Sequence, residues 1–482
     1  MAAAIEEGDP GSADQNAALI AEHLEAAGDL RGAFGWHMRA GNWSLSRDRA
    51  AARVSWQRAR QLADGLPAAD PHRMAMQIAP LTLLCGTGWL AGGSVNDSAF
   101  QELRELCEAS GDKASTAMGM AGLVMALAGH NRLREASQLA SELTALTEAI
   151  GNPTLTVAFL LSANYATSEI GEMTEALRLA QRVIDLADGD PTMGNNVMGS
   201  PLALAIAMRG FNRLCLGIEG WRSDADEAIT LAASVDPTTH VSAVMYKYVL
   251  AVPIGALPAD PDALGETADA LRIAEQASDV FTLALAQLTR GLVMVHSPHR
   301  REGFDLLAQA RDAALKEGFS MNALSIVDPA LAREKARNGD LDGAIELVRT
   351  AIDYMFETCA KLSHGIATTV LVESLLDPAA MATCKKRRMP STGWQPYPLT
   401  PVTFCTNFRC FGYRGWWRVR GAMKSLTASS WNATAPKRRR LASNRSSPRR
   451  ASAKALRVRS SRSSSATGCC AHRQLRRAES SR

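Results

Sequence analysis

Aromatic residues are scarce in this sequence: Phe, Trp and Tyr make up only 5% of its 482 residues, although 46% of the residues are hydrophobic. A β-sandwich would need more Val, Ile, Tyr and Phe in its strands. The composition instead favours helix interfaces filled by Ala and Leu. A chain of this length exceeds one ordinary domain unless it folds as a repeat array.

Long apolar runs are also missing. The two longest, Ala117–Ala128 and Leu202–Met208, are shorter than the roughly 20 residues that a membrane-spanning helix needs. The first residues include Glu6, Glu7 and Asp9 and no basic stretch followed by an apolar run, so they do not form a signal peptide. We therefore expect a cytoplasmic protein with no membrane partner.

Cysteines are few and scattered over most of the chain. Their spacing forms no disulfide framework, and in a cytoplasmic protein they are expected to be reduced, buried thiols. The four that lie before residue 377 are Cys85, Cys107, Cys215 and Cys359.

Motifs that carry catalysis are absent. The sequence contains no G-x-x-x-x-G-K-[S/T] phosphate loop, no H-E-x-x-H zinc motif and no G-x-S-x-G nucleophile elbow. We therefore predict no catalytic residue, no cofactor and no metal site, and we expect that the protein is not an enzyme. The residues that bind its partner stay unknown at this stage.

Histidines before residue 377 do not have the spacing of metal ligands on one helix face. We interpret all eight as surface or interface side chains: His23, His37, His72, His130, His240, His296, His299 and His364. His296 and His299, with Arg300 and Arg301, are candidates for an anion site at a helix start. A solvated turn is the interpretation that we favour.

The charge is divided unevenly along the chain. Residues 379–482 hold 24 of the 53 Lys and Arg residues but only one of the 49 acidic residues, Glu479. The preceding part is left with 29 basic and 48 acidic residues, so its net charge is about −19 and that of the tail about +23. The two parts therefore need separate explanations.

A short turn recurs in the acidic part of the chain. It reads Gly-Asp-Leu-Arg-Gly-Ala at 28–33, and a glycine, an acidic residue and an alanine recur in the same places at 171–176 and 339–344. Looser copies occupy 131–136 and 223–228. Glycine suits a left-handed helix end, the acidic residue suits the start of the next helix, and the small alanine allows two helices to approach closely.

The spacing of these turns predicts helix pairs. The intervals Ala136–Ala176, Ala228–Ala268 and Phe304–Ala344 are each 40 residues, enough for two helices and two short turns. The segments that follow the turns have helical period; apolar residues of 176–186 fall on one stripe. The period exceeds the 34 residues of a standard tetratricopeptide repeat (TPR), and the TPR signature is missing. The prediction is an all-α, TPR-like α-solenoid of antiparallel helix pairs.

Two groups of residues have more than one interpretation. Met118, Met120 and Met125 form a methionine-rich stretch that packs between repeats or lines a peptide groove, and we favour core packing. The tryptophans near the start, Trp36, Trp43 and Trp56, are interpreted as interface fillers, with packing against another domain as the alternative.

Several segments resemble a known family. They are Ile20–Leu30, Trp36–Gly41, the set Ala51, Arg53, Trp56, Ala59 and Arg60, and Leu83–Thr87. They are similar to the C-terminal helical-repeat region of large actinobacterial, especially mycobacterial, regulators. Those regulators carry an adenylate cyclase domain and a STAND-type AAA ATPase before the array, and related ones end in a LuxR-type helix-turn-helix. The resemblance extends over about residues 17–376.

This resemblance implies a regulatory array that senses a ligand or partner. No family catalytic residue has a matching position here, because the phosphate loop and the cyclase aspartates are missing. The resemblance implies a truncated chain that starts inside the larger protein. The implied partners are a protein or peptide on the concave face of the array, or the family's own ATPase and cyclase domains.

After Asp377-Pro378 the helical period stops, and the basic tail has three interpretations. The first is a nucleic-acid-binding arm in which Trp394, Trp416, Trp417 and Trp431 stack on bases. The second is a metal site, either around Cys405 and Cys410 or around Cys469, Cys470 and His472. The third is a frameshifted segment. High-GC codons for residues 382–396 can encode an acidic amphipathic helix in a shifted frame, so we favour the frameshift.

The resulting domain plan has three parts: a disordered N-terminus at 1–15, a TPR-like array at 16–376, and a basic, disordered, low-complexity tail at 377–482. We expect a non-catalytic, protein-interacting regulatory module for which nucleic acid is not the main partner. The alternatives are a DNA-associated transcriptional regulator that uses the tail, and a protein related to adenylate cyclases or ATP-binding regulators by family only.

Overall fold

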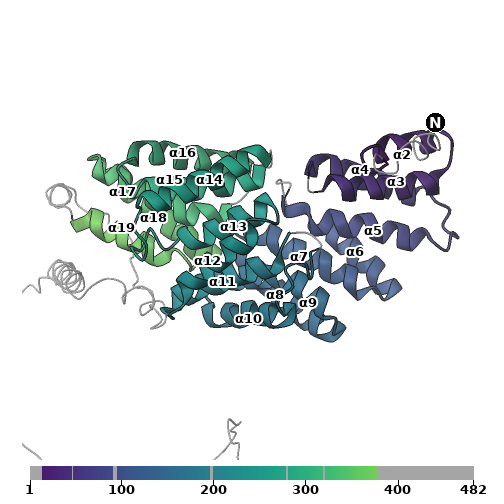
Figure 1. Ribbon diagram of the computed structural model, residues 1–482, viewed down its shortest axis with the longest axis horizontal. Helices are drawn as coiled ribbons and strands as arrows, with labels where there is room; N and C mark the ends of the chain where they lie inside the picture. The colour runs from purple at the N-terminus through teal and green to yellow at the C-terminus, as the bar shows by residue number, and fades with distance from the viewer. Residues whose placement is uncertain are drawn as a thin grey trace, which may run out of the picture. The chain divides into compact units, whose positions relative to one another are not determined.

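The structure is a computed structural model that describes residues 13–45, 47–90, 95–195, 199–277, 280–317 and 321–376. All of these residues belong to one unit, Met1–Ser425 (Figure 1). The proposed tail, 377–482, lies outside the described residues, as do residues 1–12. The three-part domain plan and the three interpretations of the tail therefore stay predictions.

The described part of the chain is built from α-helices and two short 3-10 helices, without strands. Three helices open the array: α2 (Ala17–Ala26), α3 (Leu30–Ser44) and α4 (Arg49–Asp64). From α5 onward, odd-numbered and even-numbered helices alternate as the two members of antiparallel pairs (Figure 1). The predicted all-α, TPR-like solenoid is confirmed.

The odd-numbered helices from α5 to α19 are called the inner helices, because each packs on the next one in the series as well as on its partner. They are α5 (Arg73–Gly86), α7 (Lys113–Gly129), α9 (Pro153–Glu169), α11 (Pro201–Leu216), α13 (Pro237–Tyr248), α15 (Val280–Met294), α17 (Leu324–Arg337) and α19 (His364–Leu376). The 3-10 helices η1 (Gly88–Leu90) and η2 (Met321–Ala323) stand beside this series.

The even-numbered partners are called the outer helices. They are α6 (Asp97–Ser110), α8 (Leu133–Ile150), α10 (Met173–Ala187), α12 (Trp221–Ala232), α14 (Pro261–Ala277), α16 (Arg300–Glu317) and α18 (Leu341–Thr358). In α10 the predicted stripe is confirmed, since Ala176, Leu179, Ala180 and Val183 are buried while Arg178 and Gln181 form surface contacts with acidic residues.

Local signals position the helix starts. Many helices follow a capping residue, whose side-chain oxygen accepts a hydrogen bond from a backbone N–H group in the first turn of the helix. These capping residues are Asp29, Asp48, Asn96, Asp112, Asn152, Ser200, Asp236 and Asp340. Prolines stand in the first turn of α9, α11 and α13, where no backbone donor is lost. Pro80 and Pro329 lie inside α5 and α17, which the sequence did not predict.

The predicted glycine turn is confirmed at its three regular copies. Gly28, Gly171 and Gly339 have φ angles of 83°, 81° and 89°, a left-handed conformation that favours glycine. Asp29 and Asp340 then cap the helices that follow, by accepting from the backbone N–H groups of Gly32 and Gly343. The turn therefore ends one helix and starts the next within three residues.

The looser copy at 131–136 is confirmed, since Arg132 directly precedes α8 and Ala136 is buried, but the register of the copy at 223–228 was wrong. Ser223 and Asp224 lie inside α12, and the turn is formed earlier, by Gly217 and Gly220. The close-packing position is the fourth residue after the helix cap, where Ala33, Ala136, Ala176 and Ala344 are fully buried. In α12, α14 and α16 this position holds Asp224, Leu264 and Gly303 instead of the predicted Ala228, Ala268 and Phe304.

In an open solenoid each helix pair contacts only its sequence neighbours. Here, contacts also join helices about half the array apart. The Arg49 side chain donates to the Thr238 hydroxyl at 2.9 Å, and the Trp89 and Phe281 rings lie 5.1 Å apart, edge to face. The Asn131 amide donates to the carbonyl of Met321 at 3.4 Å.

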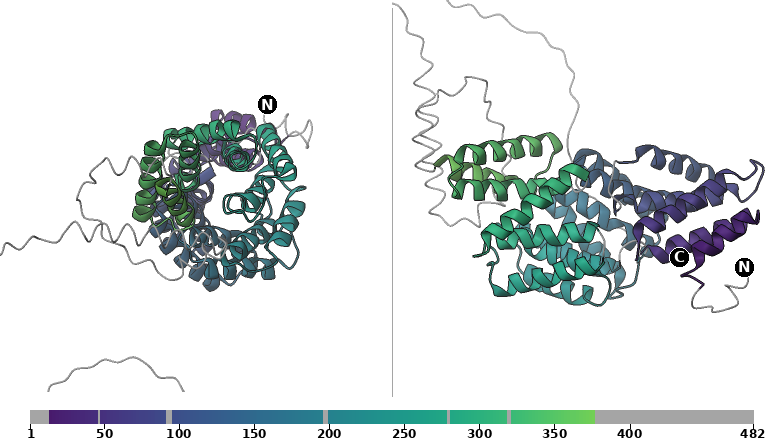
Figure 2. Two further views of the ribbon diagram at one scale, coloured as in Figure 1. Left: turned by 90° about the vertical axis from the view of Figure 1, so that its left-hand side faces the viewer. Right: turned by 90° about the horizontal axis from the view of Figure 1, so that it is seen from above.

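Several of these contacts have nearly the same sequence separation, although Tyr165–Asn322 and Arg134–Cys359, on the same line of contacts, are separated by 157 and 225 residues. The partners of the three contacts described above are separated by 189, 192 and 190 residues, and the Lys361 backbone N–H donates to the Glu169 carbonyl with a separation of 192. One superhelical turn therefore takes about 190 residues, and successive turns touch along a line that we call the seam. The left panel of Figure 2 shows the helices following one another around this closed path.

Candidate functional site

The helices line an interior cavity of about 840 Å³ that is partly open to solvent. Its wall contains residues from every inner helix between α5 and α17, together with α4, η1, η2 and part of α6. Much of the wall is apolar, including Phe100, Phe159, Met208, Phe211, Met245 and Leu285. Volume and lining are those of a small-molecule or peptide-sized binding site, for which 300–1,000 Å³ is typical.

Two of the three methionines considered in the sequence line this cavity. Met118 and Met125 are wall residues, but Met118 also packs against the core between α5, α6 and α7, so the preference for core packing was wrong only for Met125. Met120 is 6% exposed and belongs to the core between α5, α6 and α7, where the preference is confirmed. The three differ because successive residues of α7 face the cavity, the outer helix or the next inner helix.

The tryptophans near the start of the chain have two different environments. Trp56 is fully buried in the interface of α4, as predicted, and a side chain at Gly41 would collide with its ring. Trp36 and Trp43 are partly exposed and stack under Arg39 and Arg47, with 4.7 Å and 4.5 Å from guanidinium carbon to ring centroid. These two are surface residues and not interface fillers of the array.

One end of the cavity wall carries charged side chains of α4. The Arg60 guanidinium pairs with Glu102 at 2.5 Å, and Asp64 accepts from the Gln77 amide at 2.8 Å. Arg53 donates to the carbonyl oxygen of Leu84 at 3.2 Å, and burial lowers the pKa of its guanidinium. Among the described carboxylates, none lies within ion-pair distance of Arg53.

A second polar group is formed where the seam meets the cavity. Glu169 at the end of α9 accepts from the Asn322 amide at 3.4 Å, and Asn322 also donates to the hydroxyl of Tyr165. All three residues belong to the cavity wall. Burial raises the pKa of the Glu169 carboxyl to about 7 and raises that of the Tyr165 hydroxyl well above its usual value.

Burial makes the thiols of Cys85, Cys107 and Cys215 poor nucleophiles. Cys85 lies in the cavity wall, where burial raises its pKa to about 12, and burial also raises the pKa of Cys215 to about 12. All four described cysteines are free, as expected, but only Cys107 is fully buried. Cys359 accepts a hydrogen bond from the Arg134 side chain at 2.8 Å and is a seam contact.

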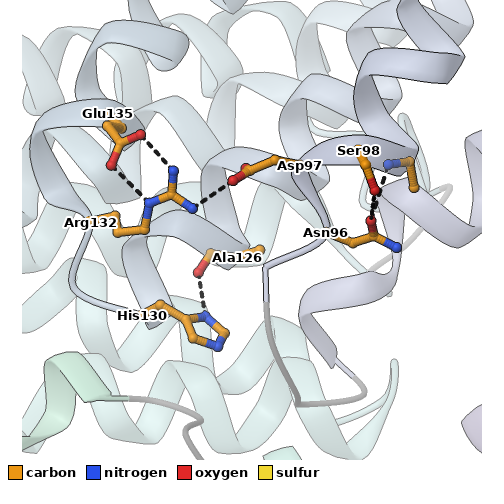
Figure 3. A network of polar contacts seen from close by, with 8 residues as sticks. Asn96, Asp97, Ser98, Ala126, His130, Arg132 and Glu135 are labelled. Atoms are coloured by element: carbon orange, nitrogen blue, oxygen red, sulfur yellow. Dashed lines mark hydrogen bonds and ion pairs between the residues drawn. The ribbon is translucent and has the colours of Figure 1, made fainter.

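A polar network beside the cavity joins the start of α6 to the start of α8 (Figure 3). Arg132 donates to Asp97 at 2.8 Å and to Glu135 at 2.6 Å and 2.8 Å. These bonds lower the pKa of the Glu135 carboxyl. His130, the neighbouring wall residue, donates through Nδ1 to the carbonyl of Ala126 at 2.8 Å (Figure 3).

The structure does not bring the histidines together. Among the described residues there is no group of three or more His, Cys, Asp or Glu side chains that could hold a metal ion. Burial lowers the pKa of His37, His240, His296 and His364, which disfavours their charged form. His299 is exposed and 3.6 Å from Glu302, so the turn there is solvated, as we favoured.

Sequence reasoning identified none of the residues at the seam end of the cavity. Tyr165, Glu169 and Asn322 come from parts of the chain more than 150 residues apart, and no motif links them. A local signal was present in α9, because a glutamate at its end follows residues that are apolar or small on several helix faces. Such a glutamate is expected to be buried, which marks it as unusual.

No protein-family model and no curated protein sequence matches this chain. Among solved structures, a Rap protein complexed with competence and sporulation factor is similar, with 10% identity, coverage of 73% of this chain and 99% of that chain, and a TM-score of 0.45. A circular tandem repeat protein with novel repeat topology and enhanced subunit contact surfaces has 14% identity, coverage of 89% and 96%, and a TM-score of 0.15. The class of this chain, a TPR-like α-solenoid, therefore rests on its own helix pairs.

None of the described helices combines the length and hydrophobicity needed to cross a membrane.

Proposed function

We propose that this chain is a non-catalytic regulatory module that binds a peptide-sized ligand in its interior cavity. The observation that carries the proposal is the cavity itself, which one superhelical turn lines with residues from every inner helix between α5 and α17. Binding sites of this kind combine an apolar wall with a few polar groups that orient the ligand. The polar groups at α4 and at the seam fit that description.

The position of the cavity supports a regulatory role. Its wall includes both partners of two seam contacts, the Trp89–Phe281 ring pair and the Tyr165–Asn322 hydrogen bond. An occupant touches both sides of the seam and stabilises the closed turn by its binding free energy. Ligand binding is thereby coupled to the curvature of the whole array, which an attached domain or partner protein can sense.

The chemistry of the wall supports a binding role over a catalytic one. The thiol of Cys85 is held in its protonated form, and the Arg60 guanidinium is already paired with Glu102. Catalytic nucleophiles need a depressed pKa or an adjacent base. A reproducible turnover of ligand by the purified protein would contradict this part of the proposal.

The resemblance of the segments before Thr87 to actinobacterial cyclase and STAND ATPase regulators extends the proposal. In such a regulator the array would report occupancy of its cavity to the ATPase domain. The acidic array, with a net charge of about −19, is also a poor partner for nucleic acid without the basic tail. Sequencing the gene and its flanking regions tests both the parent family and the frameshift.

The cavity is tested with a neutral apolar fluorophore, N-phenyl-1-naphthylamine, whose emission rises in an apolar site. We expect saturable binding to the full chain. The variant Ala126→Trp places an indole in the cavity and is expected to weaken binding about tenfold or more, since the removed volume is part of the site. Ser141→Trp, at an exposed position of α8, is the matched control and should bind as the unaltered protein does.

Equal binding by both variants would show that the fluorophore occupies another surface and would reject the cavity as the site. Circular dichroism and thermal unfolding of each variant separate loss of binding from loss of fold.

A further inference from the structure

Glu169 differs from the other buried acidic residues of the described chain. Four such residues are buried: Glu169, Asp224, Asp328 and Glu334. Asp224 pairs with Arg209 and Arg213, Asp328 pairs with Arg311, and Glu334 pairs with Arg337. Glu169 has only the neutral donors Asn322 and Tyr165, and no described Lys, Arg or His side chain lies within 4 Å of its carboxylate.

The lack of a cation has a physical consequence. A carboxylate that is removed from water needs a proton, a cation or several strong hydrogen bonds. The Asn322 contact, at 3.4 Å, is at the long end of the hydrogen-bond range and does not offset the desolvation. Burial accordingly raises the pKa of the Glu169 carboxyl to about 7. The ionised carboxylate gains most from a cation that arrives from the cavity.

The surroundings of Glu169 define what else that cation must carry. The cavity wall includes Phe211 and Tyr246, whose rings pack edge to face at 5.5 Å, together with Met208 and Ile326. A hydrated metal ion or a polar cation gains little from such a wall. An ammonium group on an apolar body satisfies both the carboxylate and the wall, and the ring faces attract cations as well.

We propose that the cavity binds an apolar ligand with a primary ammonium group, which forms an ion pair with Glu169. This inference rests on the proposed function, because it needs the cavity to be the binding site. The free N-terminus of an apolar peptide and an alkylamine supply the same chemistry. Asn322 and Tyr165 position the carboxylate, and the ammonium takes the place that no protein cation fills.

The ion pair fixes the direction of the pH dependence. An ammonium-bearing ligand requires ionised Glu169, so its affinity falls as pH drops below about 7, by up to about tenfold per pH unit. The titratable groups that face Glu169 are Tyr165 on its own helix and Tyr246 on α13. Burial raises the pKa of both phenols above the usual range, so they stay neutral throughout.

The test compares octylamine with octan-1-ol, which has the same apolar chain and no charge, by isothermal titration calorimetry at pH 8. We expect octylamine to bind at least about tenfold more tightly, since a charged hydrogen bond in a dry site exceeds a neutral one by that much. In Glu169→Gln the two Kd values should agree within about twofold, and the pH dependence should disappear. Glu142→Gln makes the same change at an exposed carboxylate of α8 outside the cavity wall and should keep the preference.

Tri-leucine amide with a free or an acetylated N-terminus distinguishes the two sources of the ammonium. Tighter binding of the free peptide than of octylamine, lost on acetylation, identifies a peptide N-terminus; the opposite order identifies a small amine. Equal binding of octylamine and octan-1-ol to a cavity that Ala126→Trp blocks would overturn the ion pair and leave the proposed function intact. Failure of every compound to bind would overturn both.

Discussion

The outer and inner helices of this array differ in how much of their surface is buried. In outer helix α10 six of fifteen residues are buried, on one stripe that includes Ala176, Leu179 and Val183. In inner helix α9 eleven of seventeen residues are buried, and they lie on all sides of the helix. An outer helix packs on one layer and faces water, whereas an inner helix packs on its partner and on two other inner helices.

This difference in packing determines which polar residues are unusual enough to indicate function. On outer helices many polar residues are solvated and form ordinary surface pairs, such as Arg178 with Glu175 at 2.7 Å, whereas Asp224 of α12 is buried and paired. On inner helices they must be satisfied inside the protein, as Ser168 is by donating to the Asn212 side chain at 3.0 Å. A polar inner residue without a matching partner, such as Glu169, is therefore a candidate for function.

We expect the largest loss of stability from a substitution that removes the ion pairs between an outer and an inner helix. Asp224 of outer helix α12 accepts from Arg209 at 2.7 Å and from Arg213 at 2.8 Å, both on inner helix α11. Asp224→Ala removes the buried carboxylate that two partly buried guanidinium groups share and should lower the free energy of unfolding by about 3–5 kcal/mol. Urea denaturation measures this change.

Glu227→Ala is the control for that substitution. Its side chain is 57% exposed and lies 3.9 Å from Arg209, so the loss should be below about 1 kcal/mol. A similar loss in both variants would mean that burial of Asp224 does not matter.

Two leucine-to-alanine substitutions compare the stability contributed by a closed helix interface with that contributed by the cavity wall. Leu143 of α8 is 0% exposed in a closed interface, and Leu143→Ala should cost about 2–5 kcal/mol. Leu204 of α11 is 3% exposed but lines the cavity, where one side already lacks neighbouring atoms. Leu204→Ala should cost less, near the lower limit of about 2 kcal/mol, in the same denaturation assay. A larger loss for Leu204 would show that the wall is packed as tightly as the closed interface.

The pH dependence of stability tests the environment of Glu169 without any ligand. Because its folded-state pKa, about 7, is above the unfolded value, the folded protein binds more protons between about pH 4.5 and 7. Its contribution is therefore fully present below that window and is lost as pH rises through it, by about 3 kcal/mol in total. In Glu169→Gln this loss should vanish. Parallel stability curves for the two proteins would contradict the raised pKa.

The smallest expected effect concerns a helix cap. Asp112 accepts from the backbone N–H of Ser115 at 3.0 Å and starts inner helix α7. Asp112→Ala should lower the free energy of unfolding by about 1 kcal/mol, whereas Asp112→Asn keeps the cap and should be close to neutral. Equal losses in thermal denaturation would assign the effect to charge and not to capping.

Local features were predictable because they depend on a few consecutive residues. The turns at Gly28, Gly171 and Gly339 followed from the need for a left-handed residue and a capping carboxylate. The looser copy at 223–228 failed because the spacing alone did not locate the cap, so Ala228 was assigned a position that Asp224 holds. A buried aspartate at that position is stable only because two arginines of the preceding helix reach it.

The cavity residues were not predictable in the same way. Met118, Met120 and Met125 share one helix and one composition, and only the neighbours of each decide whether it lines the cavity or fills the core. The seam adds contacts between residues about 190 apart, and these depend on the small rotation that each pair adds to the last.

The sequence by itself determined the helices, their pairing and the glycine turns, because period, capping and small residues act over distances of a few residues. Only the tertiary structure decided that the array closes on itself, that it surrounds a cavity, and that Glu169 stands in the wall without a cation. Those outcomes depend on the small rotation between each helix and the next, added over nine or ten helices. No local sequence pattern specifies the total rotation.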